Sequence, residues 1–178
     1  MAKELGKHCH ASPRKCGLLA LILAGVGLLP HTFAQTGMPL ERAEKNVQVE
    51  PLCIVGPGMR VHRFEVEVAD DDAKRQRGLM FRRQMAAEHG MLFVYPKRRS
   101  ISMWMKNTYL PLDMLFIEED GAVSRIEADT TPESERVIRS EKPAVAVLEL
   151  NAGEAQRRVI RAGDQILHPR FGRECPSR

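Results

Sequence analysis

The strongest structural signal in the chain is the stretch His62-Arg63-Phe64-Glu65-Val66-Glu67-Val68. Its even-numbered positions carry an imidazole and three apolar side chains, whereas its odd-numbered positions carry one arginine and two glutamates. Successive side chains of a β-strand point to opposite faces of the sheet. The alternation therefore predicts a strand with one buried and one solvent-exposed face.

Further strands are predicted along the chain after this stretch. Segments 91–95 and 113–117 are almost entirely apolar, and the turn signal Glu119-Asp120-Gly121 follows the second of them. Such runs are typical of strands buried deep in a sheet, and the turn predicts a hairpin into segment 123–128. The remaining predicted strands are residues 101–105, 144–150 and 165–167.

Two short helices are expected between the strands. Asp70 is a potential cap for the first helix, and Gly78 is its expected stop. The second helix is expected over residues 154–162, with an acidic start and Gly163 as its stop. This pattern predicts a mainly β, single compact antiparallel sandwich or barrel, with about seven strands and two short helices.

Residues 1–34 have the composition of a secretory signal peptide. Four basic residues precede an uncharged apolar run at 17–29, and Thr32-Phe33-Ala34 supplies small residues for cleavage after Ala34. The alternative is a membrane anchor, but thirteen helical residues span only roughly 20 Å of a roughly 30 Å hydrocarbon core. We therefore expect an exported protein, periplasmic or secreted, with no membrane anchor after cleavage.

Removal of this segment changes the charge balance. The full chain has 27 basic and 23 acidic side chains, and residues 1–34 hold four and one of them, so 23 and 22 remain. A balance of +1 gives little attraction to phosphate backbones, so no nucleic-acid partner is expected.

The two cysteines outside this segment are Cys53 and Cys175. In an oxidising compartment the natural hypothesis is a disulfide between them. The alternative is two unpaired thiols in flexible segments. Residues 35–59 read as a linker or flexible arm, residues 60–168 as a globular β-rich domain and residues 169–178 as a C-terminal tail.

Several motifs of the globular part occur in the order and spacing of one family. They are residues 64–69 (FEVEVA), 77–82 (RGLMFR), 90–93 (GMLF), 104–108 (WMKNT), 112–113 (LD), 147–149 (VLE), 151–153 (NAG) and 162–164 (AGD). The chain resembles the domain of unknown function number 192, a family of bacterial and archaeal proteins. One departure is Ser102-Met103 before Trp104, where the family often carries an aromatic residue. The resemblance implies a β-rich, jelly-roll-like fold and no established activity.

The best candidate for a functional site lies around the only tryptophan. Trp104, Lys106 and Asn107 lie near the end of a predicted strand, and Asp113 begins the next one after a turn. If they converge, they form a partly apolar ligand cleft with a few directing polar groups. The alternative is structural, with Asn107 and Asp113 satisfying turn amides and Lys106 pairing with Asp113.

Glu149 is a further candidate, because it interrupts the apolar segment 144–150. It would be either a carboxylate aimed into a half-buried surface, with Arg77 as one partner, or a residue on a wet strand face. Six methionines between Met80 and Met114, with His89, also fit a Cu(I) site, but methionine is equally a filler of irregular cores. No phosphate loop or zinc motif is present, so no cofactor is expected.

Three functions remain open at this point. The first is a noncatalytic module that binds a small ligand, a glycan or a cell-envelope partner through Trp104, Lys106, Asn107, Asp113 and Glu149. The second is an enzyme that uses Lys106, Asp113 and Glu149 for acid–base work. The third is a methionine-based copper-binding protein.

Overall fold

The computed structural model describes residues 48–176. The predicted signal peptide and the first part of the predicted linker lie outside these residues. The elements are β1 (Val49–Gly56), β2 (Arg60–Ala69), α1 (Asp72–Arg77), β3 (His89–Arg99), β4 (Ser102–Met103), β5 (Leu112–Ile117), β6 (Val123–Glu127), β7 (Ile138–Arg139), β8 (Ala144–Asn151), α2 (Glu154–Arg157) and β9 (Gln165–Leu167), with 3₁₀ turns at Pro57–Met59 and Pro169–Phe171. No helix in this part of the chain is long and apolar enough to span a membrane.

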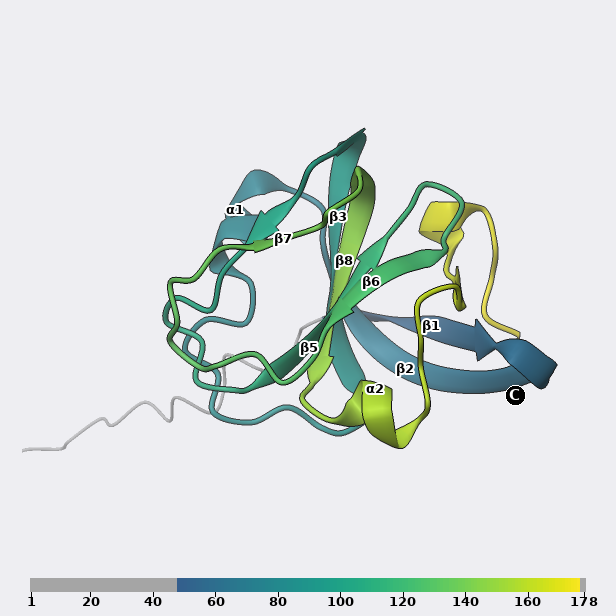
Figure 1. The fold of residues 1–178 in the computed structure, drawn as a ribbon, viewed down its shortest axis with the longest axis horizontal. Helices are drawn as coiled ribbons and strands as arrows, with labels where there is room; N and C mark the ends of the chain where they lie inside the picture. The colour runs from purple at the N-terminus through teal and green to yellow at the C-terminus, as the bar shows by residue number, and fades with distance from the viewer. Residues whose placement is uncertain (1–47, 177–178) are drawn as a thin grey trace, which may run out of the picture. The chain divides into compact units, whose positions relative to one another are not determined.

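Seven of the strands form one sheet in the order β6-β5-β8-β3-β2-β1-β9, and β4 pairs with β7 in a separate two-stranded sheet (Figure 1). Neighbouring strands are antiparallel except for β2 and β3, which are parallel. The all-antiparallel expectation is thus wrong for this pair. Parallel neighbours need a long crossover connection, and the segment that contains α1 provides it.

The sheet curls until its two outer strands meet at one end. The Ile166 N–H donates to the Gly121 carbonyl at 2.8 Å, and the Val123 N–H donates to the Asp164 carbonyl at 2.9 Å. These bonds join the start of β6 to β9 and leave fewer unpaired edge groups. The predicted compact β domain is therefore confirmed, as a partly closed barrel.

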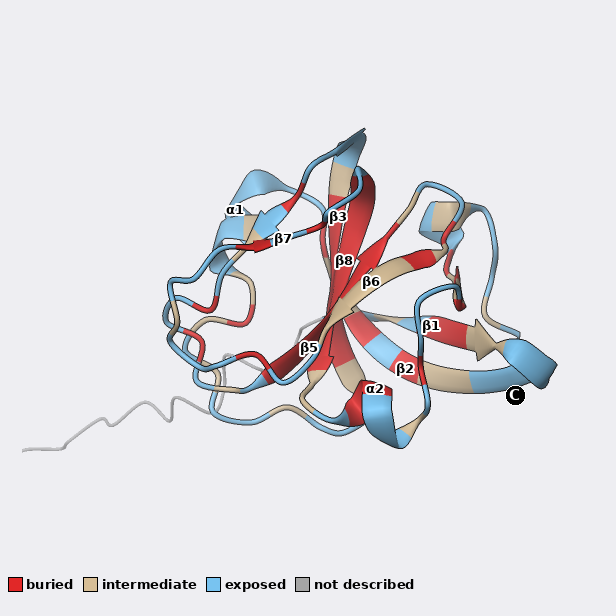
Figure 2. Cartoon of the chain, viewed as in Figure 1, coloured by how far each residue is buried: buried red, intermediate tan, exposed pale blue. Residues whose placement is uncertain are grey.

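The central strands β3, β5 and β8 are buried on both faces, and Figure 2 shows β5 and β8 red along almost their whole length. Their inner side chains fill the barrel, and their outer side chains belong to a second apolar cluster. The barrel cluster includes Leu52, Ile54, Phe64, Val66, Leu92, Leu115, Leu148 and Ile166. The outer cluster includes Leu79, Met91, Phe93, Ile101, Met105, Met114, Phe116, Ile138 and Val147. Burial on both faces explains why these strands read as continuous apolar runs.

The barrel includes residues that the sequence placed in a linker. β1 lies between β2 and β9, so the domain begins before residue 60. β1 contains Pro51, which cannot donate a ladder hydrogen bond. It is tolerated because β9 pairs only with Cys53, Ile54 and Val55, which leaves Pro51 with a neighbouring strand on one side alone.

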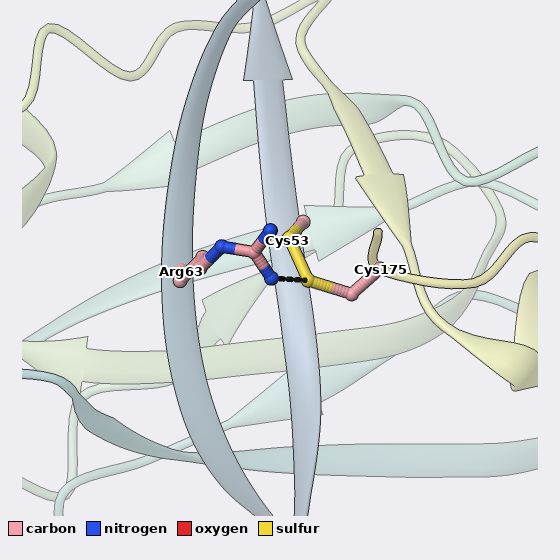
Figure 3. Close-up of a disulfide and its surroundings, with 3 residues drawn as sticks. All are labelled: Cys53, Arg63 and Cys175. Carbon is pink, nitrogen blue, oxygen red and sulfur yellow. Dashed lines mark hydrogen bonds between the residues drawn. A yellow bond between two sulfur atoms is a disulfide. The ribbon is translucent and has the colours of Figure 1, made fainter. Parts of the chain in front are cut away.

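A disulfide joins Cys53 in β1 to Cys175 in the C-terminal segment, with their Cα atoms 5.2 Å apart (Figure 3). The Arg63 guanidinium on β2 donates to Cys175 Sγ at 3.2 Å. The segment that the sequence treated as a tail is therefore fixed against the sheet.

Both helices differ in their bounds from the prediction. Asp71, rather than Asp70, caps α1, and its carboxylate accepts from the Lys74 N–H at 2.7 Å. Asp70 instead forms an ion pair with Lys74. α2 ends at Arg157 rather than Ala162, because the backbone turns into the left-handed region at Val159 (φ 56°). The strand predicted at 101–105 is reduced to Ser102–Met103.

Candidate functional site

A cavity of about 520 Å³ lies on the outer face of the sheet, between α1, β4 and the strands β3 and β8. Its apolar lining includes Leu79, Met80, Phe93, Tyr95, Met103 and Trp104. Its charged lining consists of Asp72, Arg75, Arg77 and Glu149. The size and the mainly apolar lining are those of a site for a small organic molecule.

The turn after α1 shapes one wall of this cavity. Gly78 ends the helix with φ 48°, as its predicted role as a stop requires. A Cβ atom at this position would come within 3.0 Å of the Phe93 ring. Glycine therefore lets the end of α1 lie directly against the sheet.

Glu149 is the buried carboxyl group of the cavity lining. It is 4% exposed, and its neighbours across the sheet are Met91 on β3 and Met114 on β5. Its carboxyl group makes no hydrogen bond or ion pair within residues 48–176. Burial raises the pKa of Glu149 to about 8. At neutral pH this side chain is therefore mostly a neutral acid.

Tyr95 and Met103 form a second wall. The Tyr95 hydroxyl donates to Met103 Sδ at 3.7 Å, a contact to a weak acceptor. Burial raises the pKa of Tyr95, and Glu149 contributes to the same effect. The guanidinium groups of Arg75 and Arg99 lie 5.4 and 5.9 Å from the centre of the Tyr95 ring.

Trp104 stands at the mouth of the cavity and is 53% exposed. The Lys106 ammonium lies 5.9 Å from the centre of its ring and 3.4 Å from a Glu135 carboxylate oxygen. Lys106 itself does not line the cavity. The expected pairing of Lys106 with Asp113 is wrong, because Glu135 on a neighbouring loop takes its place.

Asn107 supports the rim through its backbone. It adopts a left-handed conformation with φ 55°, and its carbonyl accepts from the Phe81 N–H at 2.8 Å. Its side-chain amide lies 4.0 Å from Met80 Sδ. Asn107 therefore ties the loop that carries Trp104 to the loop that carries Met80.

Asp113 is a structural residue that does not line the cavity. It is fully buried, and its two carboxylate oxygens accept from the backbone N–H groups of Asp129 and Ala155, each at 2.9 Å. Both oxygens are thereby used to hold the loop after β6 and the start of α2. Asp113 therefore has the structural role of accepting hydrogen bonds from backbone amides, which the sequence left open as the alternative to ligand binding.

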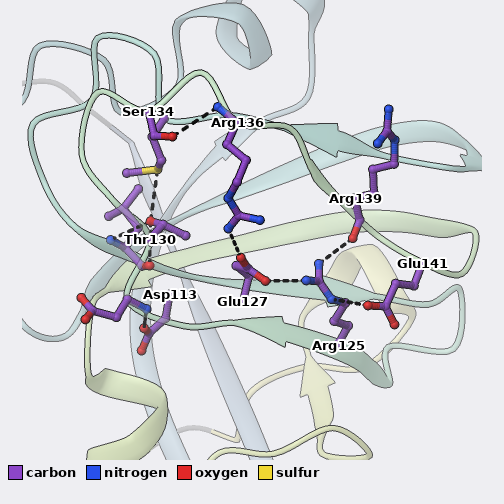
Figure 4. A network of polar contacts seen from close by, with 11 residues as sticks. Asp113, Arg125, Glu127, Thr130, Ser134, Arg136, Arg139 and Glu141 are labelled. Carbon is purple, nitrogen blue, oxygen red and sulfur yellow. Dashed lines mark hydrogen bonds and ion pairs between the residues drawn. The ribbon is translucent and has the colours of Figure 1, made fainter.

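Beside Asp113, an ionic network fixes the long connection between β6 and β8 (Figure 4). Glu127 pairs with both Arg125 and Arg136, and Arg125 also pairs with Glu141 at 2.9 Å. The Arg125 guanidinium donates to the Arg139 carbonyl at 2.6 Å. The network holds β7, and with it β4, over the outer face of the sheet.

Comparison with known protein families finds a match that covers nearly the whole of this domain. The model of the DUF192 family, described as an uncharacterised ancient conserved region, matches residues 54–168. The chain belongs to the DUF192 family. No curated protein matches the sequence.

Two solved structures resemble the DUF192 domain. One, from Sinorhizobium meliloti 1021, is described provisionally as a transcription regulator; it is 45% identical, with a TM-score of 0.69, and the match covers 71% of this chain and 98% of that one. The other, from Novosphingobium aromaticivorans DSM 12444, is described as a protein of unknown function. It is 34% identical, with a TM-score of 0.67, over 70% of this chain and 89% of that one.

The DUF192 domain thus brings together only part of the predicted site. Trp104 and Glu149 line one cavity, Lys106 and Asn107 lie beside its rim, and Asp113 is elsewhere. Arg77 also lines the cavity but forms no ion pair with Glu149. Sequence reasoning missed Arg75, Tyr95 and Phe93, because only the packing of α1 on β3 makes them neighbours of Trp104.

Five of the six methionines considered for copper serve as packing: Met91, Met105 and Met114 are buried in the outer cluster, and Met85 and Met103 are partly buried against it. Met105 Sδ lies 3.2 Å from the Thr130 hydroxyl, which donates to the Leu112 carbonyl at 2.9 Å. Met80 and Met103 line the cavity. Among residues 48–176, no group of three or more His, Cys, Asp or Glu side chains is arranged to hold a metal ion.

Proposed function

We propose that this DUF192 domain is an exported, noncatalytic binding module whose ligand is a small organic molecule held in the cavity between α1, β4 and the sheet. The observation that carries the proposal is Glu149. Burying a carboxyl group that receives no hydrogen bond from the described residues costs stability, and such groups concentrate at functional sites. A ligand that bonds to Glu149 would offset this cost.

The arrangement supports binding more than acid–base catalysis. Of the three residues considered for acid–base work, only Glu149 lines the cavity. Both Asp113 oxygens are occupied by backbone N–H groups, and Lys106 is engaged by Glu135 and Trp104. A general base and the other catalytic groups must all lie within hydrogen-bond reach of one substrate. Glu149, Asp113 and Lys106 do not meet this condition, because only Glu149 lines the cavity.

Export is supported by the sequence of residues 1–34 and by the disulfide. The first has the charged, apolar and small-residue regions of a signal peptide. The second, between Cys53 and Cys175, is a bond typical of oxidising compartments. A regulator of transcription would need an electrostatic attraction to DNA, which the near-zero charge of residues 35–178 does not provide.

The experiment that tests binding uses the fluorescence of Trp104, which is the only tryptophan of the chain and lines the cavity. Purified protein is screened by thermal shift against amines, sugars, amino acids, organic acids and metal ions, and each hit is titrated by fluorescence. A ligand of the native state raises the melting temperature and changes the Trp104 emission.

Two variants provide the controls. Ser102→Tyr places a large side chain at an exposed position of the cavity lining and should abolish the binding of every hit. Glu119→Gln changes an exposed acid in the β5–β6 turn and should leave binding intact. The proposal fails if no compound shifts both signals, or if Ser102→Tyr binds the hits as wild type does.

A further inference from the structure

Two features of the cavity are complementary to a positive charge. The first is the Glu149 carboxyl, the only deeply buried ionisable group of its lining, which becomes an anion when it loses its proton. Its neighbours across the sheet are Met91 and Met114, and it forms no ion pair with the described residues, although Arg75 and Arg77 line the same cavity. A cation from outside the protein would therefore displace the proton of this carboxyl group rather than compete with an ion pair within the protein.

The second feature is the aromatic lining. Phe93, Tyr95 and Trp104 all face the cavity, and the negative π-face of such rings attracts cations. Two cations of the protein already make such contacts, since Arg75, itself a lining residue, lies over Tyr95 and Lys106 lies over Trp104. A carboxylate enclosed by aromatic side chains is a common way to bind an ammonium group.

From this geometry we infer that the ligand carries a cationic nitrogen on an apolar body, with the Glu149 carboxylate as its counter-ion and the aromatic side chains around it. The inference rests on the proposed function, because it names the ligand class of the same cavity. The apolar body would lie against Leu79, Met80 and Met103.

The competing class is an organic anion held by arginine. Arg75 is already committed, because its guanidinium donates to the Val94 and Asp70 carbonyls and pairs with Asp72 at 2.5 Å. Arg77 lines the cavity as an exposed residue, where a single ion pair contributes little. A buried Glu149 carboxylate would attract an opposite charge more strongly than the exposed Arg77 guanidinium does, so the geometry favours a cationic ligand.

Binding of a cation would change the protonation of Glu149. The free protein holds this group mostly as a neutral acid at neutral pH, since its pKa is about 8. A bound cation stabilises the carboxylate, so the proton is released to the solvent on binding. For a quaternary ammonium ligand, which cannot titrate itself, affinity should rise as the pH approaches 8.

The test compares three probes that share a phenyl ring: benzyltrimethylammonium, benzyl alcohol and phenylacetate. Each is titrated against the full-length purified protein by Trp104 fluorescence and calorimetry. The cation should bind at least about tenfold more tightly than the neutral and anionic probes, and about tenfold more tightly at pH 8 than at pH 6. Calorimetry in buffers of different ionisation enthalpy should detect release of close to one proton at neutral pH.

Glu149→Gln keeps the shape of the side chain and removes its charge. It should weaken benzyltrimethylammonium binding about tenfold or more and abolish its pH dependence, whereas Glu119→Gln should change neither. If Glu149→Gln does not fold, the wild-type pH series decides alone.

Three results overturn the inference but leave the proposed function in place. They are equal binding of all three probes, binding of phenylacetate that Arg77→Ala abolishes, and hits in the wider screen that are all neutral or anionic while benzyltrimethylammonium has no effect up to about 10 mM. If no compound of any charge binds, the proposed function fails as well.

Discussion

Glu149 lowers the stability of the domain at neutral and alkaline pH. The carboxyl group is buried among apolar side chains and has a pKa of about 8, against an ordinary value of 4.5. As the pH rises from about 4.5 to about 8, the unfolded chain loses this proton before the folded chain does. The contribution of Glu149 to the free energy of unfolding therefore falls across this window, by roughly 4 to 5 kcal/mol, and is level above it.

The first prediction follows from this residue. Glu149→Gln should match wild type near pH 4.5 and be more stable by several kcal/mol at pH 9, because it has no proton to lose. Urea unfolding at pH 5, 7 and 9 measures the difference. Glu119→Gln, an exposed acid, serves as the control and should follow wild type throughout. An unchanged difference between Glu149→Gln and wild type at all three values would contradict the burial argument.

The second prediction concerns Asp113. Asp113→Ala leaves the N–H groups of Asp129 and Ala155 without their acceptor and should cost about 3 to 5 kcal/mol. Asp120→Ala removes one exposed bond to the Ala122 N–H and should cost less than about 1 kcal/mol. Urea denaturation of both variants decides. Equal losses would show that Asp113 is not the buried tie that its contacts describe.

At the scale of elements, the close approach of β3 to β8 depends on Gly90. A Cβ atom at this position would lie 2.6 Å from the Glu149 carbonyl oxygen and 2.8 Å from a Leu150 methyl carbon. The backbone oxygen cannot move without shifting the strand that carries Glu149. Gly90 therefore sets both the packing of the sheet and the position of the buried acid.

The third prediction is that Gly90→Ala destabilises the domain by about 3 kcal/mol, because the central strands must separate. Gly56→Ala, at the end of β1, is the matched control. Its nearest contact would be the Asp164 side chain at 3.3 Å, so it should cost much less. Thermal unfolding of the two variants provides the comparison, and a larger loss for Gly56→Ala would refute this account of the strand spacing.

The elements that follow from local pattern were predictable. β2, β5 and β8 show a period of two or a continuous apolar run, and β9 was expected at its observed bounds. β1 and the two-residue β7 were missed, because proline and short length hide them until their neighbours are known. Trp104 and Glu149 could be identified as unusual residues, but their meeting in one cavity depends on contacts between distant segments, which no local pattern encodes.

For the whole molecule, the disulfide links β1 to the C-terminal segment, at opposite ends of the domain sequence. The fourth prediction is that reduction lowers the free energy of unfolding by up to about 4 to 5 kcal/mol, as expected for a closed loop of 122 residues. Urea unfolding with and without reductant measures the loss. A double Cys53→Ser/Cys175→Ser variant should show the lower stability without reductant and no response to it. A wild-type protein insensitive to reductant would argue against a stabilising bridge.

The position of β9 constrains how the nascent chain acquires its structure. This strand is the last of the described sheet to leave the ribosome, yet it pairs with β1, the first, and bonds to the start of β6. Contacts of such high sequence separation form late and slowly. Before residue 167 emerges, the barrel remains open along β1 and β6. The seam therefore closes only after β9 has been synthesised, and a chain that stops before residue 165 would leave the outer edge of β1 and the start of β6 unpaired.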